Sequence, residues 1–142
     1  MRALLDVNVL IALLDSDHTL HAAAASWFAS HGREGWASCP ITQNGCVRIM
    51  SHPGYPNALP AHAVIERLGE AVNGEFHQFW PDDISVLDAK VVDAARIHGP
   101  RQLTDIYLLA LAVRHGGRFV TFDQSVSLQA VRGAQKQHLL TL

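Results

Sequence analysis

Residues 2–14 of the chain read Arg-Ala-Leu-Leu-Asp-Val-Asn-Val-Leu-Ile-Ala-Leu-Leu, and this stretch decides the fold class. Its first apolar run, over 2–5, ends at Asp6 and predicts a short buried strand. The second apolar run follows closely, and with Asn8 available as an N-cap it predicts a helix over 9–14. A strand followed at once by a helix is the repeating unit of α/β folds.

The rest of the chain continues this alternation. Thr104 is a suitable N-cap, and the apolar spacing after it, closed by Gly116-Gly117, predicts the clearest helix. The run over 118–122 is rich in strand-forming residues and ends at Asp123. Further helices are expected over 18–30, 41–51, 61–72 and 86–97, and further strands over 36–39, 76–80 and 139–142. The alternation predicts an α/β fold with a mainly parallel central sheet covered on both faces.

Length and composition indicate one folded domain. The chain has 142 residues, 49% of them hydrophobic and 17% charged, which favours a packed core over disorder. No apolar run approaches the ~20 residues that span a bilayer, and the N-terminus lacks a signal-peptide pattern, so a cytoplasmic protein without membrane association is expected. The net charge of −2 argues against non-specific binding of nucleic acids. It is compatible with a nucleic-acid enzyme whose acidic centre holds metal ions.

Three aspartates are expected to meet at one edge of the sheet. Asp6 and Asp123 each end a predicted strand, and the carboxyl ends of parallel strands share one edge. Asp105 opens the clearest helix, and helices that follow strands also begin at that edge. Taken singly, each aspartate is explained as a turn or helix-start residue. Together they form a carboxylate cluster whose repulsion a hard cation such as Mg²⁺ or Mn²⁺ relieves.

Four stretches of the sequence resemble the PIN-domain ribonucleases, most closely the VapC toxins of bacterial toxin–antitoxin pairs. The resemblance covers roughly residues 2–125, and its motifs stand in the order and spacing of the family. No single motif is specific, but the ordered set is. They are Leu-Leu-Asp-Val-Asn-Val-Leu at 4–10, Pro-Ile-Thr-Gln-Asn-Gly at 40–45, Leu-Thr-Asp-Ile-Tyr-Leu-Leu-Ala-Leu-Ala at 103–112 and Val-Thr-Phe-Asp at 120–123.

The resemblance implies a single PIN-like domain over 1–142, built as a three-layer α/β/α sandwich. It implies a Mg²⁺- or Mn²⁺-dependent endoribonuclease that cleaves RNA by metal-activated water and is inhibited by a cognate antitoxin. It also suggests a homodimer. Asp6, Asp105 and Asp123 match the first, third and last acids of the family and are the expected catalytic and metal-binding residues. The antitoxin is expected to place an arginine among these carboxylates and so to compete with the metal.

Three further positions complete the candidate site. Asn8 matches a polar position that orients the first acid of the family from outside the metal shell. Gln43 stands where the family usually has a catalytic glutamate, so it keeps an oxygen acceptor but lacks the charge. Arg101 precedes Asp105 in a predicted loop, where it is either a contact to an RNA phosphate or a solvated surface charge.

Two other functions fit part of the sequence. A haloacid-dehalogenase-type phosphatase would use Asp6 as its nucleophile, but that class resembles a strand followed by Asp-x-Asp, and here the third position is Asn8. It also needs a lysine near the site, and the only lysines are Lys90 and Lys136. The second alternative is a catalytically weakened protein that binds an antitoxin without cutting RNA. It is suggested by Gln43, which lacks the charge of the usual glutamate.

Overall fold

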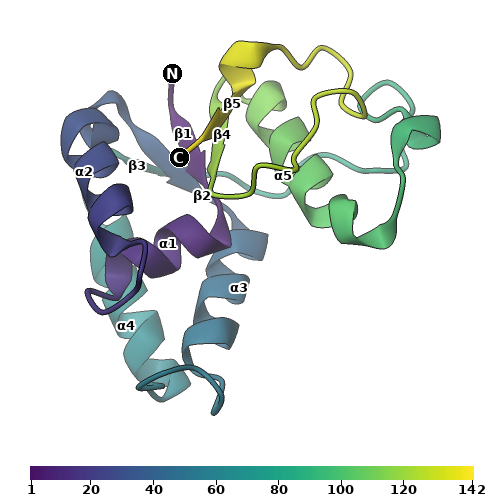
Figure 1. Cartoon of the computed structure of the whole chain (residues 1–142). Coiled ribbons are helices and arrows are strands. Elements are labelled where there is room, and N and C mark those ends of the chain that lie inside the picture. The colour runs from purple at the N-terminus through teal and green to yellow at the C-terminus, as the bar shows by residue number, and fades with distance from the viewer.

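Five short strands form one sheet in which every neighbouring pair is parallel (Figure 1). A computed structural model describes residues 1–142. The strands lie in the order β3-β2-β1-β4-β5, so the first strand of the chain occupies the centre. Their bounds are Ala3–Leu5 for β1, Trp36–Ser38 for β2, His77–Phe79 for β3, Arg118–Thr121 for β4 and Leu139–Thr141 for β5. Each lies within a predicted strand, and the parallel sheet confirms the predicted fold class.

Helices cover both faces of this sheet. They are α1 (Val7–Leu14), α2 (His21–His31), α3 (Pro40–Met50), α4 (Ala61–Val72) and α5 (Leu103–Arg114). Successive strand residues face opposite sides. Leu4 accordingly packs in one core with Leu108 and Leu109 of α5, whereas Leu5 packs in the other with Val9 of α1. Figure 1 shows α5 on one side of the strands and α1 and α2 on the other, which gives the three layers.

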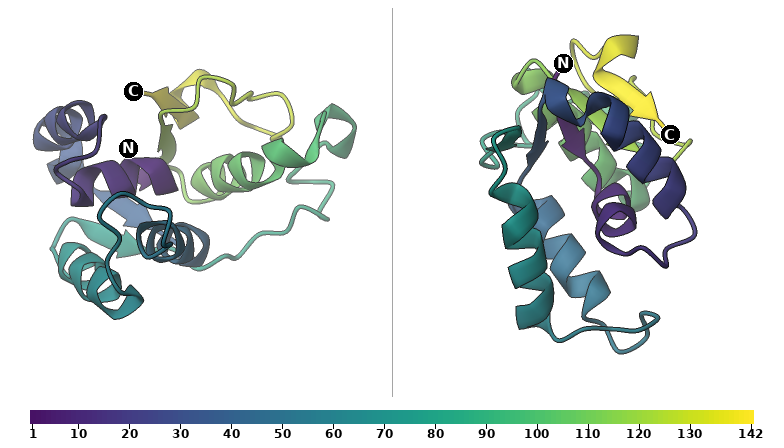
Figure 2. Two further views of the ribbon diagram at one scale, coloured as in Figure 1. Left: turned by 60° about the horizontal axis from the view of Figure 1, so that its bottom comes forward. Right: turned by 90° about the vertical axis from the view of Figure 1, so that its left-hand side faces the viewer.

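Helices α3 and α4 form an antiparallel pair that extends beyond the carboxyl edge of the sheet (Figure 2). Cys46 and Met50 of α3 and Val64 and Leu68 of α4 are buried in the same core as α1. No helix in the structure is both long and apolar enough to cross a membrane.

The helix predicted over 86–97 is wrong, since the structure has turns there and only a short 3₁₀ helix at Ala94–Arg96. The reason is competition for backbone hydrogen bonds. Asp88 Oδ1 accepts from the Lys90 N–H at 2.9 Å, which stabilises a local turn in place of a helix. A distant segment also pairs with this stretch, through an antiparallel bridge between Val92 and Val131.

Two predicted helix starts are also corrected. The residue before α1 is Asp6, and its Oδ1 accepts from the Val7 N–H at 2.8 Å, so Asp6 and not Asn8 is the N-cap. Thr104 lies within α5 rather than capping it, because a 3₁₀ turn over Pro100–Gln102 runs directly into the helix. The predicted end of α5 is confirmed by Gly116, whose φ of +67° is a left-handed conformation that suits glycine.

Candidate active site

The three predicted aspartates lie together at the carboxyl edge of the sheet. Asp6 follows β1, and Asp123 comes two residues after β4, the strand that pairs directly with β1. Asp105 lies in the first turn of α5, which begins at the same edge. Each of the three carboxylates is within electrostatic range of at least one other. The structure therefore brings together the three aspartates that were expected to share this edge, and the strand order adds that β1 and β4 are neighbours.

Asp6 is the most enclosed of the three, with 8% of its surface exposed. Its Oδ1 accepts from Val7 N–H, and its Oδ2 accepts from the Thr121 hydroxyl at 2.7 Å. Burial raises the pKa of Asp6, the two hydrogen bonds counteract this by lowering it, and the charge of Asp123 raises it further. The two contacts hold the carboxylate in one orientation at the end of β1.

Thr121 connects two of the aspartates. Its hydroxyl donates to Asp6 and accepts from the Asp123 N–H at 3.0 Å. The side chain is fully buried at the end of β4. Sequence reasoning did not identify Thr121, because threonine is an ordinary strand residue and its partner is 115 positions away. Its place in the motif Val-Thr-Phe-Asp was the only available signal.

Asp105 is half-buried and carries the largest electrostatic cost in the site. Burial, followed by the negative charges of Asp6 and Asp123, raises its pKa to about 6. Any cation that enters the site would stabilise the ionised form of Asp105 and so lower its pKa.

The pKa of Asp123 is shifted in the opposite direction, because this side chain is exposed and accepts hydrogen bonds from Ser125. Its Oδ1 accepts from the Ser125 N–H at 2.8 Å and from the Ser125 hydroxyl at 2.6 Å. These bonds lower the pKa of Asp123, so it is ionised at neutral pH. Ser125 also went unidentified in the sequence, where it reads as one more loop serine.

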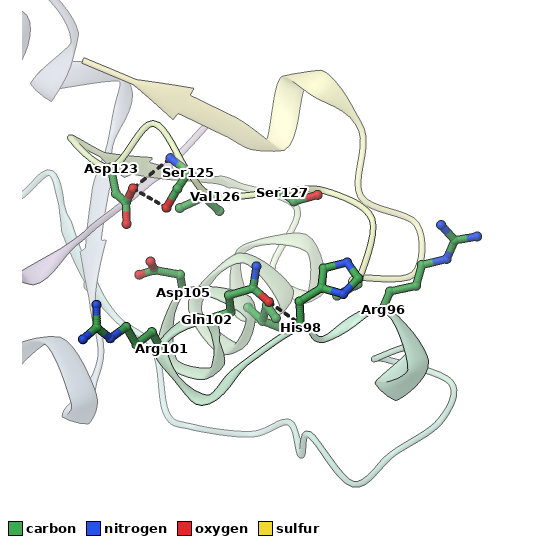
Figure 3. A pocket seen from close by; sticks show the side chains of 11 residues that line it. Arg96, His98, Arg101, Gln102, Asp105, Asp123, Ser125, Val126 and Ser127 are labelled. Atoms are coloured by element: carbon green, nitrogen blue, oxygen red, sulfur yellow. Dashed lines mark hydrogen bonds between the residues drawn. The ribbon is translucent and has the colours of Figure 1, made fainter.

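Asp105 and Asp123 line one end of a cavity of about 290 Å³, drawn in Figure 3. Asp6, which follows β1, does not line it. Arg101 lines the same end, in the 3₁₀ turn before α5, and is exposed. The structure thus places the predicted Arg101 beside the aspartates. Neither Lys90 nor Lys136, the lysines that a dehalogenase-type phosphatase would need near Asp6, lines this cavity.

Asn8 lies on the exposed face of the first turn of α1. It makes no hydrogen bond to Asp6, whose partners are Val7 and Thr121. The orienting role expected of Asn8 is therefore filled by these two residues.

Gln43 is not in the cavity with the aspartates. It lies in the first turn of α3, and its Nε2 donates to the Ser38 hydroxyl at 3.0 Å. Ser38 is in turn 2.8 Å from His77 Nε2, on the neighbouring strand β3. Gln43 also lines a separate groove between α3 and α4. No hydrogen bond joins Gln43 to any of the three aspartates, because its amide is held by the strand on the other side of β1.

The side chains of Asp6, Asp105 and Asp123, which together form the aspartate cluster, suit a hard divalent cation. All three are carboxylates, the ligand type that Mg²⁺ and Mn²⁺ prefer, and none has a basic partner in an ion pair. No three acidic, histidine or cysteine side chains are drawn together tightly enough to form a ready-made metal site. Burial and the neighbouring charges of Asp6 and Asp123 raise the pKa of Asp105, and a cation at this place would counteract both effects.

Comparison with known proteins gives a consistent result. The model of the PIN domain family matches residues 3–132 of the chain. Ribonuclease VapC44 of Mycobacterium tuberculosis is 57% identical over 142 residues, which is 100% of each chain. Ribonuclease VapC38 of the same organism is 43% identical over 99% of each chain, and ribonuclease VapC39 is 42% identical over 94% of this chain and 96% of its own.

Proposed function

Because the chain belongs to the VapC-type ribonucleases of the PIN-domain family, we propose that it is a metal-dependent endoribonuclease that acts as the toxin of a toxin–antitoxin pair. The observation that carries the proposal is the meeting of three aspartates from β1, α5 and β4 at one edge of the sheet, with no cation of the protein paired to them. The phosphatase alternative lacks its second aspartate, since Asn8 stands in that position, and neither lysine of the chain lines the cavity beside Asp105 and Asp123.

Asp6, Asp105 and Asp123 would hold Mg²⁺ or Mn²⁺. Such an ion supplies Lewis-acid polarisation of the phosphate and makes water a stronger nucleophile at neutral pH. Asp123 enters the reaction already ionised, since its hydrogen bonds to Ser125 lower its pKa. Thr121 keeps the Asp6 carboxylate fixed, so the site needs little reorganisation when its ligands bind.

Arg101 would contact the RNA backbone beside the scissile phosphate. Its side chain is exposed at the same end of the cavity as Asp105 and forms no ion pair there. A guanidinium group binds phosphate through a charge-assisted, often bidentate pair of hydrogen bonds. It would thus attract the substrate to a site whose own side chains are acidic.

The activity is tested by incubating the purified protein with total RNA in Mg²⁺, Mn²⁺ or EDTA and mapping the new 5′ ends. We expect discrete cleavage sites in either metal and none in EDTA. Binding of an antitoxin without cleavage in any metal would favour the weakened, non-cleaving alternative that Gln43 suggests. Cleavage that persists in EDTA would contradict a metal-dependent mechanism.

The proposed partner is an antitoxin that occupies the carboxylate edge with an arginine. Such an arginine would pair with Asp6, Asp105 and Asp123 and compete with the metal for them. Co-expression with the product of the neighbouring gene should relieve growth arrest, and excess Mg²⁺ should weaken inhibition in vitro. The homodimer expected for the family is tested by light scattering of the isolated protein.

A further inference from the structure

The cavity at the active site is longer than the aspartate cluster requires. Beyond Asp105 and Asp123 it continues past the side chains of His98 and Gln102 (Figure 3). Three apolar residues, Ile106, Val126 and Ala130, also line the cavity. A volume of about 290 Å³ is at the lower end of the range for small-molecule sites. The cavity therefore has room for a planar group next to whatever the aspartates bind.

The orientation of the Gln102 side chain is fixed by the backbone. Its Oε1 accepts from the His98 N–H at 2.8 Å. Only the oxygen of an amide can accept from an N–H group, so the NH₂ group of Gln102 remains as the donor. In Figure 3 the amide nitrogen is turned away from His98 and toward the cavity. At Gln102 the cavity wall thus presents a donor and not an acceptor.

We propose that this part of the cavity binds the base of the RNA nucleotide next to the cleaved phosphate and that Gln102 selects bases by donating a hydrogen bond. The proposal rests on the ribonuclease function proposed above. Proteins recognise single-stranded RNA through bases that are splayed out of the strand. These bases pack against aromatic or apolar side chains and form hydrogen bonds along their edges. The His98 ring and the apolar side chains supply the packing, and Gln102 supplies the hydrogen bond.

A fixed donor distinguishes the two kinds of base. Guanine and uracil carry a keto oxygen at the position where adenine and cytosine carry an amino group. The NH₂ group of Gln102 pairs with the keto oxygen, whereas an amino group facing it would leave two donors opposed. Keto bases should therefore be preferred at this nucleotide by about three- to tenfold, the contribution of one hydrogen bond.

The test uses a library of RNA substrates randomised around a cleavage site mapped for the wild-type protein. Cleavage products of the wild type, Gln102→Glu and Gln102→Met are sequenced, and the ratio of keto to amino bases is measured at each flanking position. In Gln102→Glu one carboxylate oxygen still accepts from His98 N–H, but the other is an acceptor in place of the donor. Gln124→Glu is the matched control, because it adds the same charge next to Asp123 at an exposed residue outside the cavity.

We expect the preference at one flanking nucleotide to invert toward amino bases in Gln102→Glu, to flatten in Gln102→Met and to stay unchanged in Gln124→Glu. Equal preferences in the wild type and both Gln102 variants would overturn the proposal while leaving the ribonuclease function intact. An equal change in Gln124→Glu would assign the effect to charge and would also overturn it. Absence of cleavage by the wild type would overturn both the proposed function and this inference.

Discussion

Two regions of the sheet differ in how their polar side chains are satisfied. Beside β1, β4 and α5, three carboxylates lie within electrostatic range of one another and have no ion-pair partner. Beside β2, β3 and α3, the polar side chains are uncharged and bonded in a chain from Gln43 through Ser38 to His77. Burial, aided by the charge of Arg2, lowers the pKa of His77 and keeps it neutral.

The two regions differ in whether a bound cation would stabilise them. Neighbouring carboxylates without a basic partner raise the free energy of the folded protein, and a bound cation would lower it, which is why we propose that the cation binds here. A hydrogen-bonded neutral chain has nothing left to bind and serves to join α3 to the strands. We refer to these two regions as the aspartate cluster and the glutamine side, the latter meaning Gln43, Ser38 and His77.

The largest effect is expected from removing one charge of the aspartate cluster. Asp6→Asn and Asp105→Asn should each lower RNA cleavage by at least ~100-fold, because residues outside a metal shell already change affinity or activity by 10–100-fold. Initial rates at saturating Mg²⁺ measure this. Asp17→Asn, which removes the same charge from an exposed turn, is the control and should cut as the wild type does. Retained cleavage in Asp6→Asn or Asp105→Asn would remove that residue from the mechanism.

A smaller effect is expected from the arginine beside the cluster. Arg101→Ala should raise KM about tenfold through the loss of one charge-assisted phosphate contact. The dependence of binding on salt should also become shallower, by about 0.7 in the logarithmic slope for single-stranded RNA. Arg48→Ala removes the same charge from the groove on the α3 side and should change neither quantity. Equal effects of the two variants would mean that Arg101 acts only through net charge.

Burial and repulsion of the Asp105 carboxylate should lower the unfolding free energy of the metal-free protein. Asp105→Asn should raise the unfolding free energy of the metal-free protein by about 1 kcal/mol at pH 7, allowing for solvent screening of a half-exposed carboxylate. The pKa of Asp105 is raised to about 6 from an ordinary value of 3.8, so between these values the folded state binds more protons than the unfolded state. Lowering the pH through this window therefore stabilises the wild type.

Urea unfolding of the two proteins in EDTA between pH 4 and 8 checks this prediction. The advantage of Asp105→Asn should be full above pH 6 and should disappear near pH 4, where the wild-type carboxyl group is also neutral. An advantage that does not depend on pH would attribute the stabilisation to packing rather than to charge.

The smallest effect is expected on the glutamine side. Gln43→Glu should leave the Mg²⁺ dependence of cleavage unchanged within about twofold, because Gln43 is bonded to Ser38 and not to the aspartates. If Gln43 does lie in the metal shell, the added charge should increase activity at limiting Mg²⁺ and less so at saturation. Superimposable titration curves support the first result, and a curve shifted to lower Mg²⁺ would place Gln43 in the cluster.

Much of the sheet and of the aspartate cluster could be predicted from the sequence. The apolar runs that end at Asp6 and Asp123 mark buried strands and the point where each stops. Parallel strands then bring both ends to one edge without any knowledge of side-chain contacts. The adjacency of β1 and β4, which places the two aspartates beside each other, became known only from the structure.

The remaining features depend on contacts between distant residues. Thr121 and Asp6 are 115 positions apart, so their hydrogen bond leaves no local pattern. The stretch over 86–97 has helical spacing, but the bridge from Val92 to Val131 and the Asp88 turn outweigh that local preference. Gln43 matches a catalytic position of the family, yet its hydrogen bond to Ser38 directs the side chain elsewhere.

We propose that the aspartate cluster, and not the glutamine side, holds the divalent cation. Isothermal titration calorimetry with Mn²⁺ measures this directly for the wild type, Asp105→Asn and Gln43→Glu at pH 7.5. We predict that the wild type and Gln43→Glu bind Mn²⁺ with similar affinity and that Asp105→Asn binds at least ~10-fold more weakly. Wild-type affinity in Asp105→Asn, or no binding of Mn²⁺ by the wild type, would show that the aspartate cluster does not hold the cation.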